Sequence, residues 1–268
     1  MRVSAATLPL SWRRAGRRLS GLPFTSWPAH LARRVRRAAG QDPALGDLTH
    51  AREELARRYL RGAGIEFGAL HFPLRVPGAV TVRYADFKPA AALQQSNPDV
   101  TSITAPDIVT DFESMTGVED QSQDFVVANH VLEHVEDPLR ALKSVSRILR
   151  PAGVAYLAVP DKRFTFDKER RITPLEHLIK DHVDGPDWSL AAHYDEWCRC
   201  VDGLSGDAHA QKLAIMLEQR SNIHFHVWDY PAMLDLFSHV ATRAEFALDV
   251  ELSMLNGIEV IWILRRRA

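Results

Sequence analysis

Residues 124–138 read DFVVANHVLEHVEDP, and the first six of them predict a strand that is buried on both faces. A continuous apolar run of this kind is typical of a parallel sheet covered by helices. Asp137 and Pro138 then supply a helix N-cap and a proline at the first helical position. Apolar residues continue at helical spacing to Leu149, and residues 154–159 form the next apolar run. Strand, helix and strand at this spacing predict a βαβ unit.

Weaker patterns extend this unit in both directions along the chain. Residues 161–228 are irregular and rich in His, Trp and Asp, which predicts a helical or loop insertion after the fifth strand. We expect an α/β protein with a Rossmann-like, mostly parallel sheet and a C-terminal antiparallel hairpin. The further strands are expected at residues 64–68, 80–86, 107–111, 245–252 and 258–264, and the further helices at 50–60, 88–96 and 231–240.

Charge divides the chain into two parts. Residues 1–41 contain nine Arg and no Asp, Glu or Lys, whereas the rest holds 24 basic and 34 acidic residues. We therefore predict a basic helical or partly disordered arm over 1–47, followed by one domain over 48–268. The acidic domain argues against nucleic-acid binding. The arm would suit an anionic membrane surface or an acidic partner, and its composition also resembles an organelle transit peptide.

Two features bear on the compartment. No apolar run approaches the roughly 20 residues that a transmembrane helix needs. Cys198 and Cys200 are separated by one residue, too close for ordinary disulfide geometry. Two unpaired thiols fit a reducing, cytoplasmic environment.

Acidic and polar residues gather where the predicted strands end, which is where ligands bind in a doubly wound sheet. Glu66 and Gly68 follow the first strand, and Asp86 ends the second, 20 residues later. That separation is expected for a carboxylate that accepts the hydroxyl protons of a ribose. A Gly-x-Gly-x-x-Gly cradle is absent, because positions 70 and 73 are Leu and Pro. A pyrophosphate needs that cradle, so NAD and FAD are disfavoured.

Three segments resemble class I methyltransferases that use S-adenosylmethionine (SAM), and most closely the branch called methyltransferase type 11. They are residues 65–70, residues 84–86 and residues 124–138, of which the last is the most specific. The stretches 149–153 and 159–160 are similar to the turn and fifth strand of that family. Residues 159–167 are similar to a bacterial subgroup that accompanies surface-polysaccharide enzymes. One departure is that the usual Gly-x-Gly reads Gly68-Ala69-Leu70.

The resemblance implies a role for each matching residue. Glu66 and Gly68 would line the methionine tail of SAM, and Asp86 would hold the ribose. Asp111 would meet the adenine amino group, with Phe112 against the ring. The cofactor would also be bordered by Asn129 and His130.

The acceptor is expected to be a small molecule or a glycan, methylated in line on a hydroxyl or an amine. A hydroxyl acceptor needs a general base near strands four and five. The preferred candidate bases are His130, Asp161 and His182, and His177 and His193 of the insertion are further candidates. The candidate residues for binding an anionic acceptor are Lys162 and Arg163.

Several alternatives stay open. Glu133 and His134 would be structural, the first as a charge that favours the helix dipole. A metal site could combine His224 and His226, which would share one face of a strand, with His177, His182, Glu176 or Asp181. No recognised zinc motif is present, so packing or acceptor binding is favoured and no metal is expected. Two other functions remain, an NAD-dependent oxidoreductase and a non-catalytic scaffold.

Overall fold

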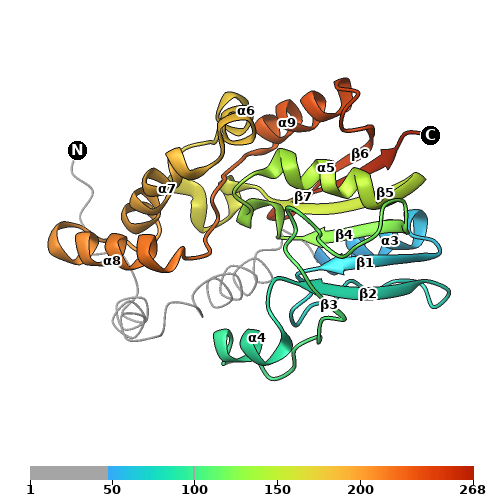
Figure 1. Cartoon of the computed structure of the whole chain (residues 1–268), viewed down its shortest axis with the longest axis horizontal. Helices are drawn as coiled ribbons and strands as arrows, with labels where there is room; N and C mark the ends of the chain where they lie inside the picture. Colours follow the sequence, from blue (N-terminus) through green and yellow to red (C-terminus); the bar gives the residue numbers. More distant parts are fainter. Residues whose placement is uncertain (1–47, 99) are drawn as a thin grey trace.

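The structure is a computed structural model, and it describes residues 48–98 and 100–268. The predicted basic arm, residues 1–47, lies outside the described residues. A seven-stranded sheet in the order β3-β2-β1-β4-β5-β7-β6 forms the centre of the described part (Figure 1). Its strands are β1 (Ala63–Phe67), β2 (Thr81–Asp86), β3 (Ile108–Val109), β4 (Gln123–Asn129), β5 (Leu149–Pro160), β6 (Leu248–Asn256) and β7 (Glu259–Arg266).

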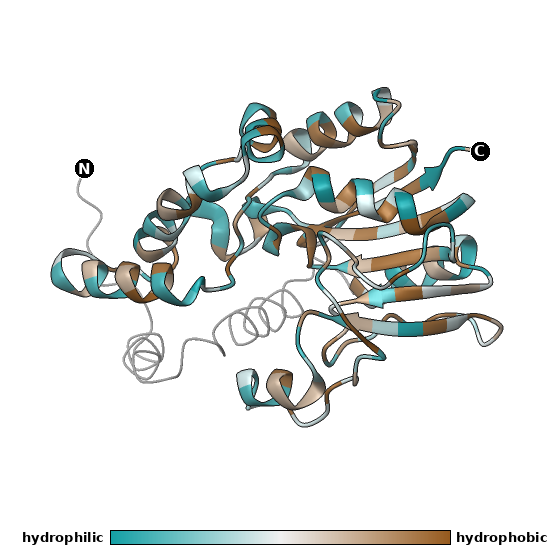
Figure 2. Cartoon of the chain, in the orientation of Figure 1, coloured by the Kyte–Doolittle hydropathy of each residue, from teal (hydrophilic) through white to brown (hydrophobic). Residues whose placement is uncertain are grey.

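Strands β1 to β5 run parallel, and β7 pairs antiparallel with both β5 and β6. The predicted Rossmann-like sheet with a C-terminal antiparallel hairpin is therefore confirmed. The hairpin enters the sheet with β7 against β5, so β6 is the edge strand. Apolar residues lie along the middle of β4 and β5, where Figure 2 shows brown.

The βαβ unit has the structure that the sequence predicts. Helix α5 (Pro138–Ile148) begins at Asp137, whose side chain accepts a hydrogen bond from the backbone N–H of Arg140. Its buried face includes Leu142 and Val145, which belong to the larger core cluster of the sheet. The strand after this helix is longer than predicted, because β5 already begins at Leu149, which pairs with Gln123 before an irregularity in the ladder.

The insertion is mainly helical. Helix α6 (Leu175–Asp184) packs against both α5 and α9 (Tyr230–Thr242), and α7 (Asp187–Cys200) packs against α8 (Gly206–Gln219). In Figure 1, α7 and α8 lie to the left of the sheet. The insertion consists of η3 (Lys162–Phe164), η4 (Phe166–Glu169), α6 (Leu175–Asp184), α7 (Asp187–Cys200) and α8 (Gly206–Gln219). The remaining helices are α3 (Leu48–Tyr59), α4 (Ala90–Ser96), η2 (Leu132–His134) and α9 (Tyr230–Thr242).

Two of the predictions concern the segment around His224 and His226 and helices that could cross a membrane. The segment around His224 and His226 is not a strand, and its one bridge in the described chain joins Trp228 to Asp161. The two histidines therefore do not share a strand face; they contact different sets of side chains, described below. Within the described residues, no helix is both long and apolar enough to cross a bilayer.

Candidate active site

A cavity of about 760 Å³ lies at the carboxyl ends of the parallel strands. Its walls come from the loops after β1, β2 and β4 and from the insertion, including Phe166 and His224. The volume suits a ligand of cofactor or drug size. All seven residues predicted to bind the cofactor line this cavity, namely Glu66, Gly68, Asp86, Asp111, Phe112, Asn129 and His130.

The loop after β1 has a left-handed backbone at two positions. Gly68 has a φ of 67° and donates its N–H to the carbonyl oxygen of Ala85, 3.0 Å away. Leu70 has a φ of 45°, a conformation that costs a non-glycine residue free energy. Leu70 occupies the position where the resemblance leads one to expect glycine. The loop has therefore kept the backbone shape that glycine favours without having the glycine.

Asp86 is buried at the end of β2 with one oxygen unsatisfied. Asp86 is 9% exposed, and its Oδ1 has no hydrogen-bond partner among the described residues. Burial raises the pKa of this carboxyl group to about 6, against the opposing effect of the Lys88 and Phe87 backbone N–H groups. A buried carboxylate oxygen without a donor calls for a ligand that supplies one.

Glu66 lies deeper, on β1. Both carboxylate oxygens accept from the backbone N–H of Leu74, at 2.9 and 3.1 Å. Burial raises the pKa of Glu66 to about 7, although this hydrogen bond and the Arg52 charge oppose the shift. The carboxyl group of Glu66 is thus held in place, and it titrates near neutral pH.

Asp111 and Phe112 form another part of the wall. The backbone N–H and the hydroxyl of Ser114 donate to Asp111, at 2.7 and 2.6 Å. Burial acts to raise the pKa of Asp111, but these hydrogen bonds outweigh it and the pKa is lowered. Phe112 is buried and meets Phe67 edge to face, with ring centroids 5.0 Å apart. Asp111 and Phe112 thus place a carboxylate beside a fixed aromatic ring in the cavity wall.

At the end of β4, Asn129 and His130 face the same cavity. The amide oxygen and nitrogen of Asn129 are buried without a hydrogen-bond partner in the described chain. His130 has a φ of 57°, and its Nε2 lies 2.7 Å from Glu259 Oε2. Such backbone strain persists where the surroundings impose it, as at ligand sites.

Glu259 organises this corner of the site from the first residue of β7. It is fully buried and accepts from Arg52, from Asn256 at 2.8 Å and from His130. Burial acts to raise its pKa, but Arg52 and His130 hold the pKa far below its usual range. Sequence reasoning missed Glu259 and Arg52, because no local pattern connects residues 207 positions apart.

The other end of the cavity is formed by the insertion and by η2. His224 lies within hydrogen-bond distance of Asp167, with Nδ1 and Oδ2 2.7 Å apart, and Arg170 also donates to Asp167. Glu133 is fully buried behind the wall, 3.8 Å from both His224 Nε2 and His130 Nδ1. Burial raises the pKa of Glu133 to about 7, and neither of its oxygens has a hydrogen-bond partner in the described chain.

Residues 27–206 match a family model described as a methyltransferase domain, which covers more than half of the chain. The chain belongs to the methyltransferase domain family. It is a SAM-dependent methyltransferase, so SAM is its cofactor, and the oxidoreductase and scaffold alternatives are set aside. The finer assignment to the type 11 branch stays a prediction. No curated protein matches the chain.

The chain is also similar to solved structures, at low sequence identity. A putative methyltransferase from Haloferax volcanii, in complex with a methyltransferase activator, is 14% identical (TM-score 0.45; 86% of this chain, 96% of that one). A putative methyltransferase from Bacillus halodurans is 11% identical (TM-score 0.45; 83% and 99%). A Rhodobacter sphaeroides chain, described as a putative Zn-dependent alcohol dehydrogenase, is 14% identical (TM-score 0.47; 78% and 86%).

The residues of this methyltransferase fit SAM. Asp86 Oδ1 and the Asn129 amide are buried polar atoms in the cavity wall that have no hydrogen-bond partner among residues 48–98 and 100–268, as a ligand rich in hydroxyl and amino groups requires. At Gly68 the backbone comes close to the loop after the neighbouring strand β4, since an added Cβ would lie 2.7 Å from Val131 Cγ2. Phe112 offers an apolar face for a flat ring.

Four of the predicted catalytic and substrate residues lie away from the cavity walls. Asp161 is fully buried and accepts from Arg163 and from the backbone N–H of Tyr230, so it fastens the start of the insertion. Lys162 donates to the carbonyl oxygen of Lys168. These contacts occupy Arg163 and Lys162 within the protein and do not support the prediction that they bind an anionic acceptor.

His182 contacts Asp137, with Nδ1 and Oδ2 2.9 Å apart, at the N-terminus of α5. Asp137 is the N-cap of α5, so this contact gives His182 a structural role, because a charged cap and its partner stabilise a helix end. Of the three predicted bases, His130 alone lines the cavity.

Proposed function

We propose that this enzyme transfers the methyl group of SAM to a hydroxyl or amine of a small-molecule or glycan-type acceptor. The observation that carries the proposal is that one cavity joins the cofactor-binding residues to a wall built from the insertion. Its volume of about 760 Å³ leaves room for a second molecule of modest size beside the cofactor.

The acceptor would lie against the insertion, where the wall offers both aromatic and polar side chains. Phe166 provides an apolar ring, and Asn222 and His224 provide hydrogen-bonding groups. Asp167 and Arg170 fix His224 from behind, at its ring and at its carbonyl oxygen. Such a surface suits a compact polyfunctional molecule such as a sugar or a hydroxylated aromatic compound.

We assign the general base to His130, which stands beside Asn129 at the end of β4. Glu259 is ionised over the ordinary pH range because its pKa is strongly lowered, so it accepts the proton of Nε2. The lone pair of His130 is then on Nδ1, the nitrogen that faces Glu133 at 3.8 Å. A proton taken from the acceptor would leave an imidazolium between two carboxyl groups, which stabilises it.

Bound SAM supplies a methyl group that its sulfonium already activates. The protein therefore has two tasks, to align the acceptor with that methyl group and to receive a proton. Asp86 and Asn129 would fix the cofactor, the insertion would orient the acceptor, and His130 would hold the released proton on Nδ1. Glu259 acts through His130 as a positioning residue.

The test begins with radiolabelled SAM and a panel of hydroxylated and aminated small molecules and glycans. For the first acceptor found, His130→Gln is expected to lower kcat at least about 100-fold, the usual contribution of a general base. The affinity for S-adenosylhomocysteine should change less than about threefold. His239→Gln serves as a matched control on α9, outside the cavity walls.

Glu259→Gln separates positioning from folding. It is expected to lower kcat and to displace the acidic limb of the kcat–pH profile, which a purely structural role would leave in place. A His130→Gln variant that keeps kcat within about threefold would remove His130 from the mechanism. Methyl transfer confined to thiol or carbon acceptors would contradict the proposed acceptor class.

A further inference from the structure

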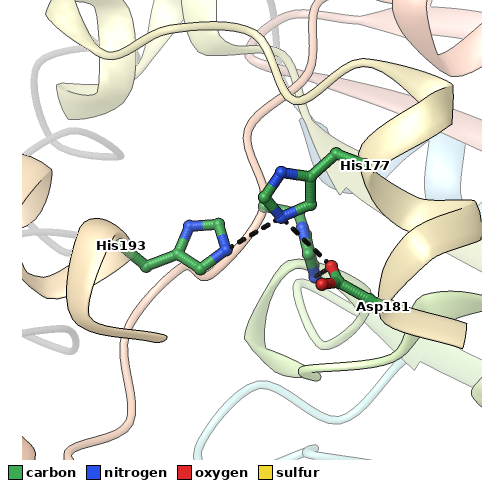
Figure 3. Close-up of side chains that lie close together, drawn as sticks. His177, Asp181 and His193 are labelled. Carbon is green, nitrogen blue, oxygen red and sulfur yellow. Dashed lines mark hydrogen bonds and ion pairs between the residues drawn. The ribbon is translucent and has the colours of Figure 1, made fainter. Parts of the chain in front are cut away.

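A second group of histidines lies in the insertion, among residues that do not line the active-site cavity. His177 and Asp181 stand one turn apart on α6, His193 comes from α7, and His226 comes from the segment after α8. Figure 3 shows His177, Asp181 and His193 converging on one point from two helices. One ligand atom from each of the four residues lies within 4.8 Å of the other three.

Three of the separations are short. His177 Nε2 lies 3.2 Å from His193 Nε2 and 3.1 Å from Asp181 Oδ2, and His226 Nε2 lies 3.8 Å from the same oxygen. Two imidazole nitrogens that face each other can share one proton at most. A single Nε2–H of His177 therefore cannot satisfy both of its neighbours.

The same four residues leave buried atoms without partners. Asp181 is fully buried, and its Oδ2 makes no hydrogen bond in the described chain despite the nearby imidazoles. His226 is 1% exposed, and its Nδ1 also lacks a partner there. A buried carboxylate oxygen and a buried imidazole nitrogen are costly when they are left unpaired. A cation at Asp181 Oδ2 would remove the first of these costs.

We propose that His177, Asp181, His193 and His226 bind one divalent transition-metal ion, with zinc as the ion of first choice. Three imidazoles and one carboxylate form a donor set that zinc accepts in tetrahedral geometry. Ligand bonds of about 2.0–2.1 Å separate tetrahedral donors by roughly 3.3 Å. The separations of 3.1 and 3.2 Å agree with this value. His226 Nε2 lies 3.8 Å from Asp181 Oδ2 and would exchange its contact with the carbonyl oxygen of Glu136, at 3.1 Å, for the ion.

Neighbouring groups are placed as the supports of such a site. The hydroxyl of Ser189 donates to Asp181 Oδ1 at 3.2 Å, which leaves Oδ2 for the ion. The His226 ring stacks on Trp228 with centroids 5.6 Å apart, and Trp188 packs beside His177. Such contacts fix ligand orientation and limit access of water. Four protein ligands fill a tetrahedral site, so the expected role is structural.

The ion would join three separate parts of the insertion to one another. His226 lies two residues after His224, which lines the active-site cavity. Fixing His226 to α6 and α7 would therefore also fix the proposed acceptor wall. The proposal is independent of the methyl acceptor and of the general base.

The test uses the purified full chain, first stripped with a chelator and then titrated with zinc or cobalt. Wild-type protein is expected to bind one ion per chain, and cobalt should give the visible absorption bands of a tetrahedral complex. Zinc should also raise the thermal midpoint, since a ligand that binds only the folded state stabilises it. Asp181→Asn and His193→Asn are expected to abolish stoichiometric uptake at equal circular dichroism.

Two further variants make the assignment specific. His239→Asn removes a histidine on α9 and should leave uptake unchanged. Glu133→Gln tests the competing group Glu133, His134 and His224, whose ligand atoms also lie within 4.8 Å of one another. The proposal is overturned if folded wild-type protein takes up no ion. It is also overturned if Asp181→Asn binds as wild type does, or if uptake is lost in Glu133→Gln alone.

Discussion

A methyl group added to Gly68 would lie 2.7 Å from Cγ2 of Val131. The loop after β1 and the loop after β4 are therefore closely packed in the cavity wall. We predict that Gly68→Ala lowers the free energy of unfolding by about 1–3 kcal/mol, because it adds both this contact and a left-handed alanine. Affinity for S-adenosylhomocysteine should fall at the same time, as measured by calorimetry.

Gly78→Ala is the matched control for that experiment. A Cβ at Gly78 meets nothing within 4 Å, and its backbone is not left-handed. Its stability and cofactor affinity should equal those of wild type. Equal behaviour of the two variants would show that the contact between the loops has no energetic consequence.

Asp86→Asn is predicted to weaken cofactor binding and yet stabilise the protein. The folded pKa of Asp86, about 6, exceeds its unfolded value of about 3.8, so protonation favours the folded state. This contribution is complete below the unfolded pKa and is lost as the pH rises through 6. Removing the ionisable group should therefore raise stability at pH 8 by about 1–3 kcal/mol and leave it nearly unchanged at pH 3, below the unfolded pKa. Urea unfolding at both pH values measures the difference.

Cofactor affinity should itself depend on pH. The ionised Asp86 accepts ribose hydroxyl protons, whereas the protonated form has lost part of that capacity. Affinity for S-adenosylhomocysteine is expected to fall about tenfold between pH 7 and pH 5, through the pKa of about 6. Glu66, with a pKa of about 7, also lines the cavity and would contribute above that range. In Asp86→Asn the fall below pH 6 should disappear, and a profile unchanged from wild type would refute the assignment.

His182→Ala is predicted to change stability and leave catalysis intact. The contact with Asp137 holds the cap of α5, and the exposed fraction of the His182 side chain is 24%. We expect a loss of about 1 kcal/mol, below the value for a fully buried charged pair. With any acceptor found in the screen, kcat should stay within about twofold of wild type. A large fall in kcat at unchanged stability would restore His182 as a catalytic candidate.

Much of the fold could be read from local patterns. The strand at residues 124–129 and the helix after Asp137 depend on apolar periodicity and on a cap, both of which are properties of neighbouring residues. The carboxylates that end β1 and β2 were also predictable, because parallel strands bring their carboxyl ends to one edge. These are the parts of the site in which sequence position determines spatial position.

The remaining parts depend on contacts between distant segments. Nothing near Arg52 indicates that Glu259 will meet it, and the histidines of the insertion converge from α6, α7 and a loop. For Asp161 the sequence predicted a role in the site, and the structure places the residue away from the cavity. Its position after β5 suggested a cavity-facing base, but the chain turns there and buries it against Arg163 and Tyr230. An accessible and a buried aspartate have the same sequence signature at a strand end.

The position of β7 has a consequence for synthesis of the chain. A ribosome completes the residues that line the cavity, the last of which is Ile258, before it reaches Glu259, and the hairpin then docks with β7 against β5. Until that moment β5 is an open edge with unpaired backbone groups, and such edges invite pairing with other chains. The contact between His130 and Glu259 also cannot form until β7 has been made. The newly made domain is therefore expected to be aggregation-prone and inactive until this hairpin docks on β5.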